Sequence, residues 1–332
     1  MKTRTIATAA LAAAALSITG TTGLQADEIA KANGKAEYGI VGALEGKEVG
    51  VLEFKDGKDL DGDERLRLPR GFALRFVGDK TTVKRELEPA SNGRRGHGDG
   101  VIDVANAASE LTVLSVHGNN EPSVYRRTHK VGPGTLVVSG SSDNDGAKFV
   151  VWEGKLVFAK ESDGGTHCQG SNGFLEIYST QSEQLAKGAP DRVGVLVLGG
   201  TGGDQIADEA SVIVGGAHSD RGGVFDVNTR AETIGGFSIA NGTLRYAFGG
   251  AVGSTGTLTV ESEVPVKGTG KNTIEITDGG KWLPGDYVLL KASEEFASAD
   301  AFLASFALKG IDNGKLVLGA EKRSLILRVS AK

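Results

Sequence analysis

The sequence predicts an all-β solenoid, a fold in which short strands stack turn upon turn along one axis. Three observations predict it. Glycine accounts for 50 of the 332 residues, about twice the usual share. One phrase, a glycine followed by apolar residues two and four places later, recurs along the chain. Over much of the chain its copies follow one another at roughly 20 residues, a spacing typical of stacked structural repeats.

The repeated phrase predicts strands with one buried face. Its copies begin at Gly134, Gly154, Gly173, Gly194, Gly223, Gly242, Gly256 and Gly314. The first four copies are almost evenly spaced, and the later ones are less regular. Alternate side chains share a face of a strand, and every residue at the two marked places is apolar. These pairs are Leu136/Val138, Leu156/Phe158, Leu175/Ile177, Leu196/Leu198, Phe225/Val227, Leu244/Tyr246, Leu258/Val260 and Leu316/Leu318.

Further strands are needed in each turn, because strands this short are not stable alone. We expect them at residues 148–151, 211–214 and 233–239, and before the repeats at 48–54, 72–77 and 110–116. Residues 27–127 are less repetitive and fit either an N-terminal β-cap or the first irregular turns. The repeats span 128–281, and 282–332 supply the final strands and a C-terminal cap. An antiparallel sandwich with regular hairpins is the alternative fold.

The C-terminal cap is expected to contain a short helix. A strand is predicted at 287–290, and Ser298 is placed to cap a helix whose Phe302, Leu303 and Phe306 form an apolar stripe. The open end of a solenoid has to be covered, because exposed strand edges pair with other chains. We expect this helix to be a lid rather than a cofactor-binding element.

The N-terminus predicts export. Lys2 and Arg4 precede an apolar, alanine-rich run at residues 6–18, and Ala26 offers a cleavage point. The run is too short for a comfortable membrane span, and an alanine-rich helix is the alternative interpretation. We therefore predict a signal peptide over 1–26, a secreted or cell-surface location, and no transmembrane segment after its removal.

Charge and cysteine content exclude some functions. Removing residues 1–26 leaves 35 basic and 42 acidic residues, a net charge of about −7, so the chain carries no footprint for nucleic acid. Cys168 is the single cysteine and has no internal disulfide partner. The fold must hold without a disulfide.

The repeat also resembles a known family. Residues 129–140 resemble the opening of the autotransporter-associated β-strand repeat, and 152–157 resemble its closing half. Residues 197–206 and 223–236 are similar to large bacterial surface proteins that carry these repeats. The resemblance covers roughly 128–330 and implies a right-handed parallel β-helix on an exported bacterial protein, without catalytic residues. A full autotransporter ends in a membrane barrel, for which we expect no room here after the repeats.

Calcium is the one cofactor worth weighing. Residues 199–207 fit the nonapeptide of calcium-binding β-rolls, with Asp204 as its acid. That chemistry needs consecutive copies, and the next, at 215–220, is imperfect. Asp59, Asp61 and Asp63 match the first three ligand places of an EF-hand, but Glu64 then stands where glycine is needed and Arg70 where the last ligand belongs. The single match at 199–207 is weak, a solvated acidic turn is favoured for residues 56–64 and a turn for 142–146, and we expect no cofactor.

An enzymatic site has few candidates. Parallel β-helices include polysaccharide lyases and glycosidases, and glycosidases need two carboxylates across the scissile bond. Glu176, Asp226 and Arg245 occupy outward strand positions in three turns and are the candidates for one groove. The five histidines show no metal-ligand spacing.

The function that follows is structural. We expect an exported, non-enzymatic, structural or adhesin-like β-helix of the bacterial surface or extracellular matrix. Surface glycans or other surface proteins are the expected partners, and varied loops would recognise them. A carbohydrate-active or glycan-binding β-helix is the alternative.

Overall fold

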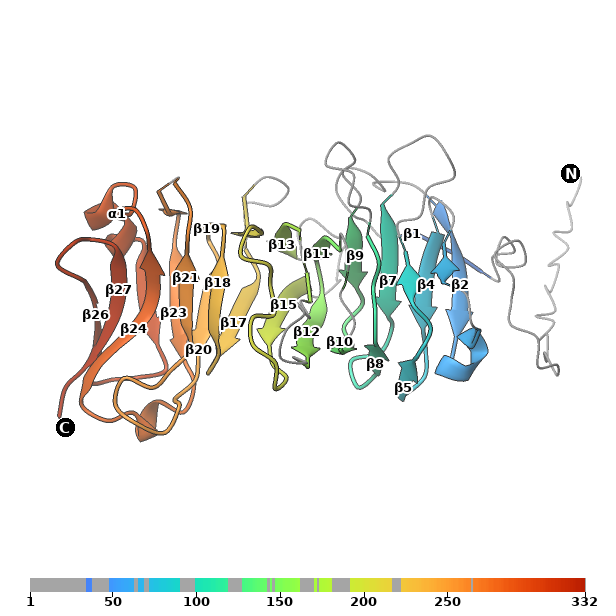
Figure 1. The fold of residues 1–332 in the computed structure, drawn as a ribbon, viewed down its shortest axis with the longest axis horizontal. Coiled ribbons are helices and arrows are strands. Elements are labelled where there is room, and N and C mark those ends of the chain that lie inside the picture. The colour runs from blue at the N-terminus through green and yellow to red at the C-terminus, as the bar shows by residue number, and fades with distance from the viewer. Residues whose placement is uncertain are drawn as a thin grey trace, which may run out of the picture.

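The strands stack along one long axis to form a parallel β-helix (Figure 1), as predicted. The computed structural model describes residues 34–37, 48–62, 65–68, 72–89, 99–118, 127–141, 144, 147–161, 170–171, 173–180, 192–216, 222–263 and 265–331. The predicted signal peptide and Cys168 lie outside these residues. Within them, no helix is long and apolar enough to span a membrane.

Two ten-strand sheets form the sides of the solenoid. The first sheet comprises β1 (Gly34–Glu37), β2 (Glu48–Phe54), β4 (Phe72–Phe76), β7 (Gly100–Val104), β9 (Thr128–Val131), β11 (Phe149–Val151), β13 (Leu175–Ile177), β16 (Ser211–Val214), β19 (Gly236–Ala240) and β22 (Lys267–Thr269). The second comprises β5 (Lys80–Val83), β8 (Glu110–Val113), β10 (Thr135–Gly140), β12 (Gly154–Lys160), β15 (Arg192–Leu198), β17 (Val224–Asn228), β20 (Thr243–Tyr246), β23 (Asn272–Ile276) and β25 (Phe306–Lys309), with β14 (Ser179–Thr180) beside β15. The strands expected at 48–54 and 211–214 are β2 and β16.

A third face closes the turn. It begins with β3 (Leu66–Arg67) and β6 (Leu87–Glu88) and ends in a sheet of β18 (Ala231–Ile234), β21 (Thr257–Val260), β24 (Gly285–Ala292), β27 (Ser324–Val329) and β26 (Gly314–Leu318). The segment expected as one strand at 233–239 is divided between β18 on this face and β19 on the first sheet. Pairing is parallel except for β1–β2, β14–β15, β24–β27 and β26–β27.

Side chains bond to the backbone of the third face in the middle turns, where the described residues form an isolated bridge between Ser171 and Ile206 and no longer strand. Asn144 accepts a hydrogen bond from Val116 N at 2.9 Å and donates to Gly170 O at 2.8 Å. Glu232 accepts from the backbone N–H groups of Gln205 and Ile206. The buried backbone therefore finds partners where no continuous strand runs.

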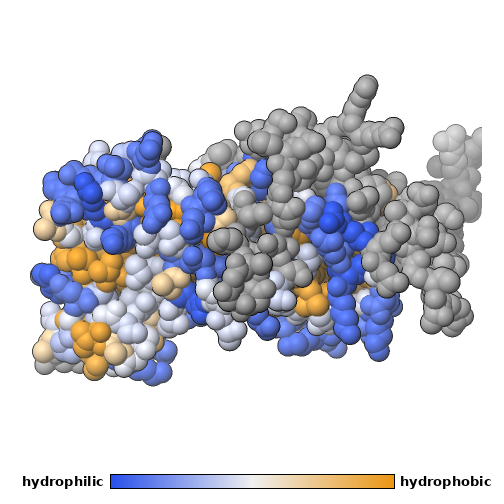
Figure 2. All heavy atoms as spheres, viewed as in Figure 1, coloured by the Kyte–Doolittle hydropathy of each residue, from blue (hydrophilic) through white to orange (hydrophobic). Residues whose placement is uncertain are grey.

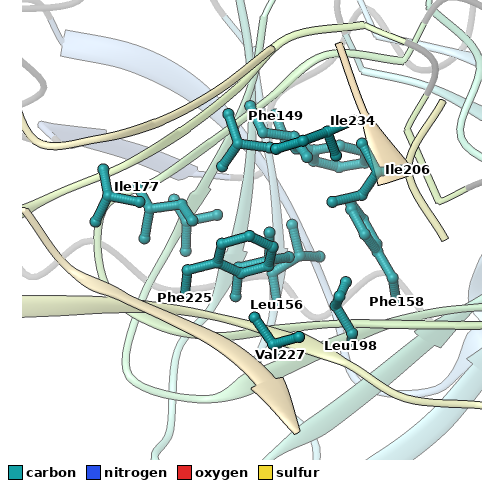
Figure 3. Packing of buried hydrophobic residues seen from close by; sticks show 14 of the residues in the cluster. Phe149, Leu156, Phe158, Ile177, Leu198, Ile206, Phe225, Val227 and Ile234 are labelled. Carbon is teal, nitrogen blue, oxygen red and sulfur yellow. The ribbon is translucent and has the colours of Figure 1, made fainter. Parts of the chain in front are cut away.

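The core runs inside all three faces. Leu136, Leu156 and Leu196 lie in register, because β10 pairs with β12 and β12 with β15. All the predicted inward residues are buried except Leu316 and Leu318, which pack partly buried against the core. Figure 3 shows side chains from the three faces converging: Phe149, Leu156, Phe158, Ile177, Leu198, Ile206, Phe225, Val227 and Ile234.

The repeated phrase does not occupy a single column. Gly154 pairs directly with Gly194, which begins the second copy after it in the sequence. The intervening copy, which begins at Gly173, contributes its strand to the first sheet instead. The copies at Gly256 and Gly314 lie on the third face. The phrase marks a corner followed by a strand, and all faces have such corners. At Gly154 the corner requires φ +67°, and a Cβ there would lie 2.4 Å from Gly132 O.

The N-terminal residues continue the same solenoid. β7 pairs in parallel with β9, with Gly100 opposite Thr128, so the ladder crosses the expected boundary at 127/128 without a break. The described strands β2, β4, β5, β7 and β8 therefore belong to the same two sheets as the repeats. A short 3-10 helix, η1 (Gly57–Leu60), takes the second-sheet place in the first turn, where Gly57 N donates to Thr81 Oγ1 at 2.8 Å.

The helix near the C-terminus is α1 (Ala299–Ala304). Ser298 precedes it but forms no side-chain capping bond, because its own backbone is left-handed at φ 49°. Phe302 is buried with its ring centroid 4.4 Å from that of Phe296 and 5.1 Å from that of Phe306. It also lies against Gly268 of β22, so α1 covers the last strand of the first sheet.

Candidate functional site

The acidic turn at residues 56–61 is built by its own backbone. Asp59 Oδ2 accepts from Lys55 N at 3.2 Å and from Asp56 N at 3.0 Å, while Asp56 Oδ1 accepts from Lys58 N at 3.1 Å. These bonds form a capping box on η1. Asp61 is exposed just after the helix, and Asp63 lies outside the described residues. Asp59 thus has a structural role that the sequence pattern did not indicate.

Asp204, the other calcium candidate, is exposed in the loop after β15. Among the residues that the structure places, no three or more His, Cys, Asp or Glu side chains are grouped to hold a metal ion. The second partial nonapeptide, at 215–220, lies largely outside the described residues.

Asp226 and Arg245 belong to a charge ladder on the outer side of the second sheet. Arg245 lies between Asp226 and Glu275 in register on β17, β20 and β23. Its Nη1 is 3.4 Å from Asp226 Oδ2, and its Nε is 2.9 Å from Glu275 Oε2. Lys309 of β25 follows opposite Glu275, so charges of alternating sign run along the axis. Burial raises the pKa of Asp226 above its ordinary value, although Arg245 opposes the shift.

Glu176 lies elsewhere. It is on β13 in the first sheet, 4% exposed, and its Oε1 is 3.6 Å from Arg127 Nη2. The Arg127 guanidinium also lies 5.2 Å from the centroid of the Phe174 ring. The three outward residues singled out from the sequence therefore divide between two sheets and do not line one groove.

A buried polar cluster on the outer side of the first sheet went unpredicted. Trp152 Nε1 donates to His129 Nδ1 at 2.9 Å, and His129 Nε2 lies 3.2 Å from Asp99 Oδ2. Asp99 Oδ1 accepts from Arg127 N at 3.1 Å. The Trp152 ring packs on Tyr178 with centroids 4.9 Å apart. Successive members lie one turn apart, so strand register, not sequence spacing, brings them together.

The geometry of this cluster suits structure rather than proton transfer. Trp152 donates to Nδ1, which places the proton of neutral His129 on Nε2, facing Asp99. A general base needs a free acceptor nitrogen within reach of a substrate, and His129 is 2% exposed. Burial acts to raise the pKa of Asp99, but hydrogen bonds from His129 and Arg127 N outweigh it, and the pKa lies below its ordinary value.

Three charged side chains point into the core. Lys130 Nζ donates to three backbone oxygens, those of Val131 at 2.9 Å, Gly132 at 2.7 Å and Glu153 at 3.0 Å. Burial lowers its pKa to about 7. Lys160 Nζ donates to Leu114 O and Ser139 O.

Glu232 is the third of these side chains. Burial raises its pKa to about 8, although the hydrogen bonds that it accepts from two backbone N–H groups act to lower the pKa. Lys130, Lys160 and Glu232 are each no more than 1% exposed. Their polar atoms form hydrogen bonds with backbone groups at the corners of the solenoid. Because they are buried, they do not reach a ligand on the outside.

Comparison with known proteins identified no relative of this chain. No family model, no curated protein and no solved structure matches the chain.

Proposed function

We propose that the chain is an exported, non-enzymatic β-helix that serves as a rigid spacer or adhesin-like display scaffold at the bacterial surface or in the extracellular matrix. The observation that carries the proposal is its continuous inner core, one cluster of buried apolar residues from Phe54 to Val329. Each turn contacts chiefly its neighbours, an arrangement that makes a rod and presents loops along it.

The polar groups support a structural role over catalysis. Asp226 and Glu275 are each bonded to Arg245, Glu176 is buried beside Arg127, and His129 is enclosed by Trp152 and Asp99. Glycoside hydrolysis requires two carboxylates with space between them for the sugar, and here an arginine occupies that space. Recognition of surface glycans or proteins then falls to the loops.

Export is supported by the sequence. Residues 1–26 have the charge and apolar pattern of a signal peptide, and residues 128–330 resemble the autotransporter-associated β-strand repeat. Protease treatment of intact cells tests this part. We expect the full chain to be degraded from outside and a variant lacking residues 2–26 to stay protected in the cytoplasm. Protection of the full chain in intact cells would reject a surface location.

A carbohydrate-active enzyme is the competing function. The test is a screen of neutral and acidic polysaccharides with the full chain, Asp226→Asn and Glu275→Gln. We expect no turnover above buffer for any of the three. Turnover by the full chain that either substitution abolishes would replace the structural proposal with an enzymatic one.

A further inference from the structure

The C-terminal end of the solenoid carries an unpaired strand edge. β26 is the last strand of the third-face sheet, and among the described strands it pairs with β27 alone. It is the outermost strand at that end (Figure 1). Such an edge presents a row of backbone donors and acceptors to any strand that can reach it.

The hydrogen-bonding pattern between β26 and β27 shows which backbone groups of β26 point away from β27. Gly319 N donates to Ser324 O at 2.8 Å, and Ser330 N donates to Asn313 O at 2.9 Å. Because antiparallel bonding alternates along a strand, residues 313, 315, 317 and 319 bond toward β27. The N–H and C=O groups of Gly314, Leu316 and Leu318 therefore point away from the molecule.

β26 has few of the features that normally prevent an edge strand from pairing with another chain. Lys315 is the one charged residue in β26, and the strand contains no proline. Leu316 and Leu318 are only partly buried. Four further apolar residues nearby are also partly buried at this end: Leu303, Phe306, Leu308 and Ile311. Hydrophobic groups reach the surface between hydrophilic ones at this end (left in Figure 2).

We propose that β26 pairs antiparallel with β26 of a second copy of the chain, joining two solenoids at their C-terminal ends. With Leu316 on the two-fold axis, Gly314 of each copy lies opposite Leu318 of the other, and the outward groups of all three residues bond across the axis. The inference does not depend on the proposed function.

Charge and length favour a second copy in this orientation. Exposed Asp312 precedes β26, and exposed Glu321, Lys322 and Arg323 follow it with a net charge of +1. Antiparallel pairing brings Asp312 of one copy beside this net-positive end of the other, whereas parallel pairing would set Asp312 beside Asp312. Head-to-tail pairing on the same face would place β26 against β3, a strand of two residues.

Hydrogen exchange tests the pairing without any substitution. The full chain is compared at low and high concentration, residue by residue. We expect exchange at Leu316 and Leu318 to slow about tenfold or more at high concentration. Lys315 and Val317, already bonded to β27, act as internal controls and should not change. Exchange at Leu316 and Leu318 that is independent of concentration would overturn the proposal.

A pair of variants tests the backbone bonds themselves. Leu318→Pro removes an outward N–H that β27 does not use, and Leu318→Ala makes a similar loss of packing while it keeps that N–H. Light scattering after gel filtration should show a dimer for the natural chain and Leu318→Ala, and a monomer for Leu318→Pro. A monomeric natural chain, species larger than a dimer, a dimer that survives Leu318→Pro, or loss of the dimer in Leu318→Ala would each refute it.

Discussion

The first and second sheets differ in how many of their faces are buried. In β10, β12 and β15 of the second sheet, inward residues are buried and the residues between them remain partly exposed. In β7, β9, β11 and β13 of the first sheet, every residue is buried. A strand covered on both faces loses the alternation of polar and apolar residues that marks a strand covered on one. The same solenoid therefore contains two kinds of strand.

Burial of the outer side changes which side chains the first sheet contains. Val101, Val150, Trp152 and Tyr178 form a second apolar cluster there. Polar groups in this layer need partners of their own, and the bonds from Trp152 to His129 and from Asp99 to Arg127 supply them. Further along the same sheet, Ser238 of β19 is partly exposed and the strand alternates again. Among the described strands of three or more residues, full burial occurs in β7, β9, β11 and β13 of the first sheet.

The sharpest test of one-sided burial compares neighbours on β12. Leu156→Asp places an unpaired charge in the core and should cost about 5 kcal/mol or more of unfolding free energy. Val157→Asp, on the outer side of the same strand, should cost about 1 kcal/mol or less. Urea unfolding measures both. Similar losses for the two variants would mean that the second sheet is covered on both faces.

This difference explains part of what the sequence revealed, although the doubly buried β11 and β13 were also expected, from residues 148–151 and the Leu175/Ile177 pair. The one-sided strands β10, β12 and β15 show alternation, which predicted both their extent and the burial of Leu156. The doubly buried β7 has no alternation and was not predicted. The partnership of Asp99, His129 and Trp152 depends on turns of unequal length, since 30 residues separate Asp99 from His129 and 23 separate His129 from Trp152. No local pattern encodes such a register, so the sequence could not predict this cluster.

Trp152 tests double burial directly. Trp152→Ala removes a large ring from the outer side of the first sheet and should cost about 3–5 kcal/mol. Val157→Ala, at an outward position of the second sheet, should cost less than about 1 kcal/mol. Thermal and urea unfolding give both values. An equally small loss at Trp152 would show that the outer layer of the first sheet contributes little to stability.

Lys130 extends the comparison to the inner side of the first sheet, where a charge replaces an apolar residue. Its pKa falls from 10.5 to about 7 in the folded chain. Between those values the unfolded chain binds more protons, so stability rises with pH above about 7 and the gain is complete above the unfolded pKa. The gain is on the order of 3–5 kcal/mol.

The control for this effect is Lys130→Met, which cannot titrate. Urea unfolding from pH 6 to pH 10 should show the stability of the natural chain rising relative to this variant. Parallel curves for the two proteins would mean that Lys130 keeps its ordinary pKa, and hence that water reaches this corner of the core.

The smallest expected effect concerns the charge ladder on the outer side of the second sheet. The Arg245 side chain is 27% exposed and that of Glu275 is 37% exposed, so solvent screens their attraction. Arg245→Met leaves Asp226 and Glu275 without their shared cation and should cost about 1 kcal/mol, less at high salt. A variant that also carries Asp226→Asn and Glu275→Gln removes the remaining like charges and should recover part of the loss. A cost of several kcal/mol that salt does not change would place this ladder in a buried environment, as on the outer side of the first sheet.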